Sequence, residues 1–199
     1  MKILIVSLIF LSFLFICFQI YVKMSTSNAE EQKYSVTKKF DNFEIRFYPE
    51  AVMASVTMNA KSYSEVSGSG FRKLAGYIFG GNKDSQQISM TSPVHMDIKQ
   101  VTSIMSFVMP SKYDENTLPI PNDPNIIIHK STPEFVAALR FGGFASDKEI
   151  RNYTAKLKKL LFENNIKVIG NFKFFGYDPP YQVIDRRNEI IVAIEWEKV

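Results

Sequence analysis

Few side chains in this 199-residue chain belong to the types that catalyse reactions or bind metals. The two histidines, His95 and His129, lie far apart in the sequence, and the single cysteine, Cys17, lies in an apolar segment. No HExxH helix, Walker loop or G-x-S-x-G motif occurs, so the usual sequence patterns of zinc, phosphate and acyl-transfer sites are missing. We therefore expect no catalytic residue and no metal site. Each histidine should be an exposed or hydrogen-bonded strand residue.

Aromatic and sulfur-containing side chains are abundant, with 17 Phe, 9 Tyr and 8 Met. Several stand close to the breaks between predicted elements, among them Phe71, Met90 and Tyr181. Most must fill the core, but aromatic rings and methionines also form adaptable walls around a flat, apolar ligand. The composition is therefore compatible with a packed core alone and with a core beside an apolar groove.

Two helix-start signals stand 84 residues apart (146 minus 62). Ser62 and Ser146 are each followed, three residues later, by a glutamate, which is the spacing of a capping box. A Pro-Glu pair and an apolar run precede each signal, at Pro49 and Pro133, again 84 residues apart (133 minus 49). The shared offset predicts a duplicated unit whose copies close around a pseudo-twofold axis and leave a shared cleft.

Each copy follows the plan strand–strand–helix–strand–strand. Alternating apolar and polar residues predict the strands, and apolar residues three and four apart predict the helices. Because strands dominate and connections are short, we expect an α+β fold. Its duplicated β-β-α-β-β units should form a distorted, mainly antiparallel β-barrel flanked by two helices. The predicted strands cover residues 43–48, 51–58, 94–98, 103–109, 126–131, 135–141, 172–177 and 189–197.

The segment from Ile3 to Val22 is almost entirely apolar and carries no charge. Twenty helical residues span roughly 30 Å, the thickness of a bilayer's hydrocarbon core, and Lys2 and Lys23 flank the segment as snorkelling ends. We expect residues 1–23 to form an N-terminal transmembrane anchor, residues 24–33 a polar linker and residues 34–199 the globular domain. A cleaved signal peptide is the alternative, although this run exceeds the usual signal core of about 7–15 residues.

From Met24 onward the chain has 22 Lys and Arg (24 minus 2) and 20 Asp and Glu, a net charge of +2. A domain so balanced lacks the basic face of nucleic-acid-binding proteins, so no nucleic-acid partner is expected. An N-terminal anchor with a charged tip usually delivers its domain across the membrane. We therefore expect a single-pass membrane protein with its domain on the periplasmic or extracytoplasmic side.

A series of motifs, in the same order along the chain, resembles the SOUL or heme-binding-protein family. The resemblance extends from about Tyr34 to Trp196, and its last two motifs are specific. The motifs are Phe43–Tyr48, Gly70–Ile78 with Gly80-Gly81-Asn82, Ile88–Val94, Phe107–Pro110, Phe141–Phe144, Gly176–Pro180 and Arg186–Ile190.

The resemblance implies a distorted barrel of two related halves with two helices, which agrees with the duplication. It also implies non-catalytic, non-covalent binding of heme or another tetrapyrrole in an apolar surface groove beside the first helix of the domain. On this resemblance, the expected ligand contacts are Phe71, Leu74, Ala75, Ile78, Met90 and Tyr181.

The chain departs from the family pattern at the iron. Some members carry a histidine, proposed as an iron ligand, at the position that Phe47 holds here, and phenylalanine cannot bind iron. We therefore expect the membrane-anchored domain to hold heme by apolar burial without a strong axial ligand. The alternatives are a pocket for another amphipathic molecule, with Glu50 or Glu134 facing a cation, a tetrapyrrole-modifying enzyme, and a protein-interaction module without a ligand.

Overall fold

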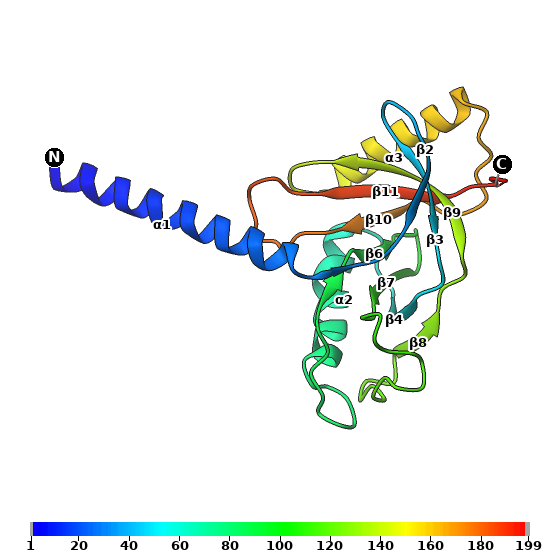
Figure 1. Cartoon of the computed structure of the whole chain (residues 1–199), viewed down its shortest axis with the longest axis horizontal. Coiled ribbons are helices and arrows are strands. Elements are labelled where there is room, and N and C mark those ends of the chain that lie inside the picture. The colour runs from blue at the N-terminus through cyan, green and yellow to red at the C-terminus, as the bar shows by residue number, and fades with distance from the viewer. Residues whose placement is uncertain (1, 198–199) are drawn as a thin grey trace.

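The computed structural model describes residues 2–197 and consists of one long helix that projects from a domain of sheet and helices (Figure 1). Helix α1 spans Lys2–Ser27, α2 spans Tyr63–Ile78 and α3 spans Asp147–Glu163. The two-residue strands β1 (Glu30–Glu31) and β5 (Thr91–Ser92) pair in parallel. The strands of the main sheet are β2 (Ser35–Lys39), β3 (Glu44–Tyr48), β4 (Val52–Met58), β6 (Val94–Asp97), β7 (Ser103–Val108), β8 (Ile126–Lys130), β9 (Glu134–Phe141), β10 (Lys173–Gly176) and β11 (Asn188–Ala193).

The strand order of the main sheet reproduces the duplication. Within the described residues, nine strands form one curled sheet in the order β2-β3-β9-β11-β10-β6-β7-β4-β8, and neighbouring strands are antiparallel. On either side of the central β10–β6 pair, β10, β11, β9 and β3 correspond to β6, β7, β4 and β8. The copies exchange their first strands, since β3 pairs with β9 and β8 with β4. The predicted α+β fold is confirmed, with the barrel open along one side.

The two helices of the domain begin beside each other at the pseudo-twofold axis. Ser62 and Ser146 cap α2 and α3, and each hydroxyl accepts a hydrogen bond from the backbone N–H three residues later at 3.3 Å. The backbone N–H of Tyr63 donates to Asp147 Oδ1 at 2.6 Å, across a sequence separation of 84 residues. That separation equals the offset of the duplication, so the contact joins equivalent places of the two copies. A carboxylate at a helix N-terminus is also electrostatically favourable.

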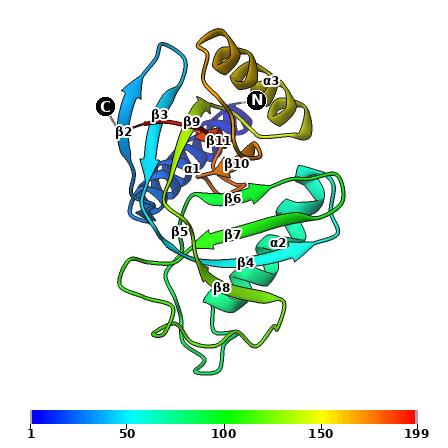
Figure 2. The ribbon, with the colours of Figure 1, turned by 90° about the vertical axis from the view of Figure 1, so that its right-hand side faces the viewer.

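The hydrophobic core lies between the sheet and these two helices. Helix α2 packs on β4 and β7, and α3 packs on β9 and β11 (Figure 2). Gly70 lets α2 approach the sheet closely, because a Cβ there would lie 2.7 Å from Met58 Cε. Leu74 of α2 and Leu157 of α3 are both fully buried. Burial of such side chains contributes about 1.5–3 kcal/mol each, so packing on one sheet face holds both helices in place.

The structure differs from the sequence predictions at the edges of the sheet. No strand is predicted at β2, because all five of its side chains are exposed and an edge strand without a buried face has no alternating pattern. Strand β11 ends at Ala193, whereas the prediction continues to residue 197. Beyond the end of β11, Ile194 instead forms an isolated bridge with Val168.

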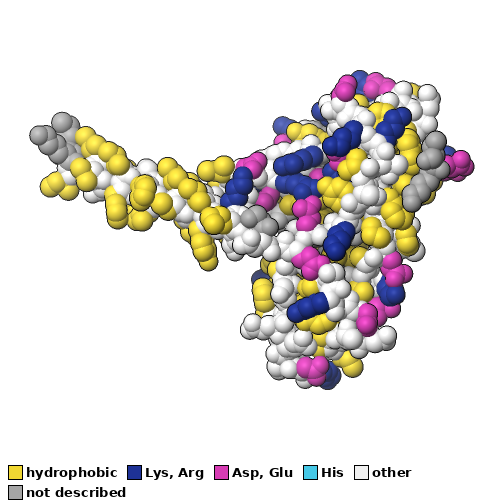
Figure 3. Space-filling view, in the orientation of Figure 1, with side chains coloured by type: hydrophobic (Ala, Val, Ile, Leu, Met, Phe, Trp, Pro, Cys, Tyr) yellow, Lys and Arg dark blue, Asp and Glu magenta, His cyan; other side chains and the backbone are white. Residues whose placement is uncertain are grey.

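Helix α1 projects from the domain with apolar side chains exposed along its length (Figure 3). Over Ile3–Thr26 it is long and apolar enough to cross a membrane, and an 18-residue stretch of it has a mean hydropathy of 2.8. The helix continues to Ser27, and Glu30–Glu31 then pair with β5. The segment predicted as a linker, residues 24–33, therefore follows the surface of the domain instead of forming a free tether.

Candidate functional site

The sheet face opposite the helices is hollowed beside the central strand pair. Side chains that point to this face alternate along each strand with those that enter the core. They surround a cavity of about 350 Å³, whose walls come mainly from β4, β6, β7, β8 and β10. Apolar residues such as Met53, Ile104 and Phe175 line it together with both histidines of the chain. Its volume and its mixed apolar and polar lining make it a candidate binding site.

His95 lies at the centre of the sheet, on the wall of this cavity. It is paired with Phe175 across the β6–β10 contact, and the two rings stack with centroids 3.7 Å apart. One ring nitrogen, Nε2, is hydrogen-bonded to Gln32 Oε1 at 2.8 Å. Burial, reinforced by the positive charge of Lys173, lowers the pKa of His95 to about 3. His95 is therefore a neutral imidazole at physiological pH, held flat against an aromatic ring.

His129 belongs to a hydrogen-bonded row across β8, β4 and β7. Its Nε2 lies 2.8 Å from Ser55 Oγ, and Ser55 Oγ lies 2.6 Å from Ser106 Oγ. Its other nitrogen, Nδ1, is 3.2 Å from the carbonyl oxygen of Lys130. A hydroxyl beside an imidazole is the core of a nucleophile–base pair, but a backbone carbonyl stands here where triads place a carboxylate. These hydrogen bonds fix the positions of His129, Ser55 and Ser106 on the cavity wall.

Two buried polar atoms of the cavity wall have no hydrogen-bond partner within the described part of the chain: Tyr48 Oη and Asp97 Oδ1. The Tyr48 side chain is only 4% exposed. Burial, followed by the nearby negative charge of Glu189, raises the pKa of Tyr48 to about 12, so the hydroxyl keeps its proton. An unsatisfied buried polar group costs about 1–3 kcal/mol. Tyr48 is thus a protonated hydroxyl, shielded from the cavity and close to the charges of Glu189 and Arg46.

A buried ion cluster occupies the same sheet face beside the cavity. Glu189 is fully buried and accepts from Arg46 Nη1 at 2.7 Å and from Tyr177 Oη at 2.9 Å. Arg187 adds a second guanidinium, 3.0 Å from the same carboxylate. Burial raises the pKa of Glu189, but the hydrogen bonds and charges of the two arginines outweigh it and hold the pKa below its usual value.

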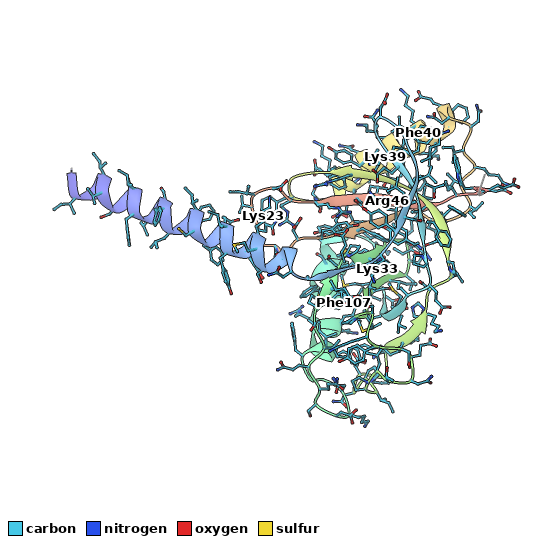
Figure 4. The ribbon with its side chains drawn as sticks, viewed as in Figure 1. Lys23, Lys33, Lys39, Phe40, Arg46 and Phe107 are labelled. Carbon is cyan, nitrogen blue, oxygen red and sulfur yellow. The ribbon has the colours of Figure 1, made fainter. Side chains whose placement is uncertain are left out.

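The cluster joins β3 to β11, the strands on either side of β9. Figure 4 labels Arg46 in the same part of the sheet as Lys39 and Phe40. A second hollow of about 320 Å³ lies over the cluster. Because every charged atom of the cluster has a partner, its role is to hold strands together, and it offers no free group for catalysis.

The six residues predicted to contact a tetrapyrrole do not share a described cavity. On α2, Phe71 is 39% exposed and Ala75 is 9% exposed. Leu74 and Ile78, at 0% and 1%, face the core. Met90, in the loop after α2, is half-buried, and Tyr181, in the loop between β10 and β11, is 58% exposed. Their joint contact with a ligand remains a prediction.

The position held by Phe47, where an iron ligand is proposed in some members of the resembled family, is occupied by an aromatic contact. The Phe47 ring packs on Phe135 with centroids 5.0 Å apart. Within the described residues, no cluster of three or more His, Cys, Asp or Glu side chains could hold a metal ion. Both imidazoles of the chain lie on the wall of the cavity.

Comparison with known proteins gives the chain a family. The model of the SOUL heme-binding protein family matches residues 29–193, which include all the strands of the main sheet and both helices of the domain. Heme-binding protein 1 of Xenopus laevis is 30% identical over 155 residues, which cover 74% of this chain and 81% of that protein. Heme-binding protein 2 of Mus musculus is 28% identical over 158 residues, covering 75% of this chain and 76% of that protein.

Solved structures share the fold at low sequence identity. The EcmrR C-terminal domain superposes with a TM-score of 0.55 at 14% identity, covering 82% of this chain and 99% of that domain. A hydrolase from Listeria innocua superposes with a TM-score of 0.55 at 8% identity, covering 87% and 97% of the two chains. Identities this low show a common architecture alone. The match to the family model rests instead on nearly the whole domain, and the chain belongs to the SOUL heme-binding protein family.

Proposed function

We propose that this chain is a membrane-anchored, non-catalytic protein that binds heme or a related tetrapyrrole. The observation that carries the proposal is the family match over residues 29–193. Relatives named as heme-binding proteins align with about three quarters of the chain, which supports binding over catalysis. Burying a few hundred Å² of porphyrin contributes several kcal/mol at about 25 cal/mol per Å². After the cost of association this favours micromolar carriage over a permanent cofactor.

The iron is expected to lack a strong protein ligand. The Nε2 atoms of His95 and His129 are hydrogen-bonded to Gln32 and Ser55. Either histidine would have to give up its Nε2 contact before that atom could bind iron. The apolar residues of the cavity wall, such as Met53, Ile104 and Phe175, are the feature that favours a porphyrin.

Two locations are available for the ligand, and one experiment separates them. Hemin is added to the full chain in detergent micelles, and binding is followed by the Soret band and by quenching of Trp196, the single tryptophan. A site at the predicted α2 residues makes Phe71→Ala weaken binding while Phe79→Ala, an exposed phenylalanine just beyond α2, serves as the control. A site in the cavity makes Thr57→Trp, at its mouth, weaken binding instead. No Soret change at micromolar hemin for the unaltered chain would contradict the proposal.

The anchor is preferred over a cleaved signal peptide because α1 makes polar contacts with the domain. The Gln19 side chain donates to Tyr181 O at 3.1 Å and accepts from Val183 N at 2.8 Å. A segment that is removed after export has no need of such contacts. Intact-mass measurement of the membrane-extracted protein is expected to show the residues of α1, and protease added outside the membrane is expected to digest the domain. A measured mass that corresponds to a chain beginning near residue 30 would refute the anchor.

A second candidate function is binding of an amphipathic cation, favoured by the position of Glu134. This carboxylate lies on the cavity wall, where it pairs with Lys173 at 3.4 Å. Glu50, by contrast, pairs with Lys130 at 2.7 Å outside that cavity. An aromatic phosphonium ion that raises the thermal midpoint of the chain, but not of Glu134→Gln, would support this function. Glu50→Gln is the matched control. If the phosphonium ion does not shift the thermal midpoint of the unaltered chain, cation binding is excluded.

A further inference from the structure

The last turns of α1 are bonded to the loop between β10 and β11, residues 177–187. Gln19 and Val22 are each only 3% exposed, although the side chains of residues 3–18 are all exposed. Both polar ends of the Gln19 amide are used, one by the carbonyl of Tyr181 and the other by the N–H of Val183. Phe18 adds an aromatic contact to Tyr181, with ring centroids 6.4 Å apart. These contacts fix where the helix leaves the domain.

The contacts lie inside the apolar run of the helix. Lys23, which Figure 4 labels at the base of α1, forms an ion pair with Asp185 of the same loop. Gln19 precedes Lys23 by four residues, which is about 6 Å along a helix axis. A lysine beside a membrane span keeps its ammonium group in the polar boundary of the bilayer. Tyr181 and Val183 must therefore lie about one helical turn deeper than that boundary.

The loop is held rigidly from beneath. The Arg186 guanidinium, 8% exposed, donates to the carbonyls of Pro179 at 2.7 Å and Gln182 at 2.6 Å. The Gln182 side chain is itself buried and donates to Ile184 O at 3.2 Å. Exposure of side chains on this loop is thus a consequence of its folded shape.

Large apolar side chains point outward from this fixed backbone. Tyr181, Val183 and Ile184 are 58%, 48% and 55% exposed. Phe144, 54% exposed, lies beside them, because Arg186 is centred 4.6 Å above its ring. The connections that carry these residues, β9–α3 and β10–β11, lie on the side of the domain from which α1 projects (Figure 1). We call these four residues the junction patch.

We propose that the junction patch inserts into the headgroup region of the bilayer that holds α1. The domain would then rest on the membrane in one orientation. The occupant of the patch is lipid, because Tyr181 of the patch contacts Phe18 on the apolar surface of α1, and Tyr181 and Val183 lie deeper than Lys23. Tyrosine and large aliphatic residues are suited to this boundary. The inference rests on the proposed membrane anchor, and its test treats the two separately.

The test places single tryptophans in the full chain, in a Trp196→Phe background, reconstituted into phosphatidylcholine vesicles. Ile184→Trp reports the junction patch, and Leu11→Trp reports the middle of α1. Ile120→Trp is the matched control, since Ile120 is an equally exposed isoleucine (67%) between β7 and β8. Lipids brominated near the headgroup end or the middle of their acyl chains then quench fluorescence according to depth.

We expect deep bromines to quench the Leu11→Trp variant best, and shallow bromines to quench Ile184→Trp severalfold more than Ile120→Trp. Adding Gln19→Leu should reduce the quenching of Ile184→Trp and leave that of Leu11→Trp unchanged, because it removes both hydrogen bonds between Gln19 and the loop. If Leu11→Trp is quenched but Ile184→Trp is no more quenched than Ile120→Trp, the inference is overturned and the anchor stands. If Leu11→Trp is not quenched, the anchor itself fails.

Discussion

The two copies of the duplicated unit have the same strand order but use the open face of the sheet differently. On β11 of the second copy, Glu189 is the second residue of the strand and carries the buried ion cluster. On β7 of the first copy, Ile104 is the second residue and lines the cavity. The extra edge strand β2 pairs with β3, the exchanged first strand that lies beside β9 of the second copy. Tyr34, just before β2, packs on Tyr48 and lies 4.3 Å from the Arg46 guanidinium. The ion cluster therefore lies on the part of the face around β3 and β11, and the cavity of about 350 Å³ lies on the part around β4 and β7.

The connections after the central strands differ as well. In the first copy, β6 and β7 are joined by residues 98–102, a short turn at the surface. In the second, β10 and β11 are joined by residues 177–187, which contact α1. Symmetric strands therefore build the cavity, while the asymmetric loop joins the domain to the helix. Variation in loops on a common scaffold is the usual origin of function in a shared fold.

The largest expected effect is on the ion cluster around Glu189. Glu189→Gln removes the buried carboxylate that Arg46 and Arg187 share, so the two guanidinium groups keep only their more exposed partners, Glu44 and Glu31. Loss of one partner from a buried ion pair costs about 3–5 kcal/mol, and thermal unfolding of the variant in detergent should show a loss of that size. Glu195→Gln breaks only the exposed pair with Lys167 and should change stability by less than about 1 kcal/mol. Equal losses in the two variants would remove the distinction between the copies.

A pH dependence should arise where the copies meet. The pKa of His95 is about 3 in the folded chain, against 6.5 in the unfolded chain, so the unfolded state binds more protons between these values. Stability should therefore be highest above pH 6.5 and fall as the pH drops toward 3, by at most about 1.4 kcal/mol per pH unit.

The comparison of His95→Gln with the unaltered chain isolates this effect. Between pH 6.5 and 5, Glu189 contributes little slope, because its lowered folded pKa and the unfolded value of 4.5 both lie below this interval. The variant should lose most of the fall in unfolding temperature over this interval. His129→Gln, which alters the other histidine of the cavity, should retain the fall. A slope that survives His95→Gln would contradict the assignment.

The smallest effect is expected at Tyr48, between the cavity and the ion cluster. Tyr48→Phe removes a buried hydroxyl that has no partner in the described residues, so the variant should be more stable by about 1 kcal/mol. Tyr177→Phe provides the contrast, since its hydroxyl donates to Glu189 and its loss should destabilise the chain. A less stable Tyr48→Phe would mean that the hydroxyl is paired.

The local features of the fold could be predicted from the amino-acid sequence. The caps at Ser62 and Ser146, the alternating strands and the length of α1 depend on neighbouring residues and on hydrophobic periodicity. The 84-residue offset also predicted the symmetry that the Tyr63–Asp147 contact displays. The groove beside α2 was a weaker prediction, because a helical stripe at Leu74 and Ile78 has the same pattern whether it faces a ligand or the core.

Only the tertiary structure decided where the polar groups meet. Ser55 and His129 are 74 residues apart, and Gln32 and His95 are 63 apart, so no local spacing reveals either contact. Gln19 looks like an interruption of an apolar run until the loop beside Tyr181 supplies both of its partners. The physical reason is the exchange of first strands between the copies, which brings distant segments onto one face. Sequence periodicity determines which face of each strand is apolar, and long-range pairing determines what that face encloses.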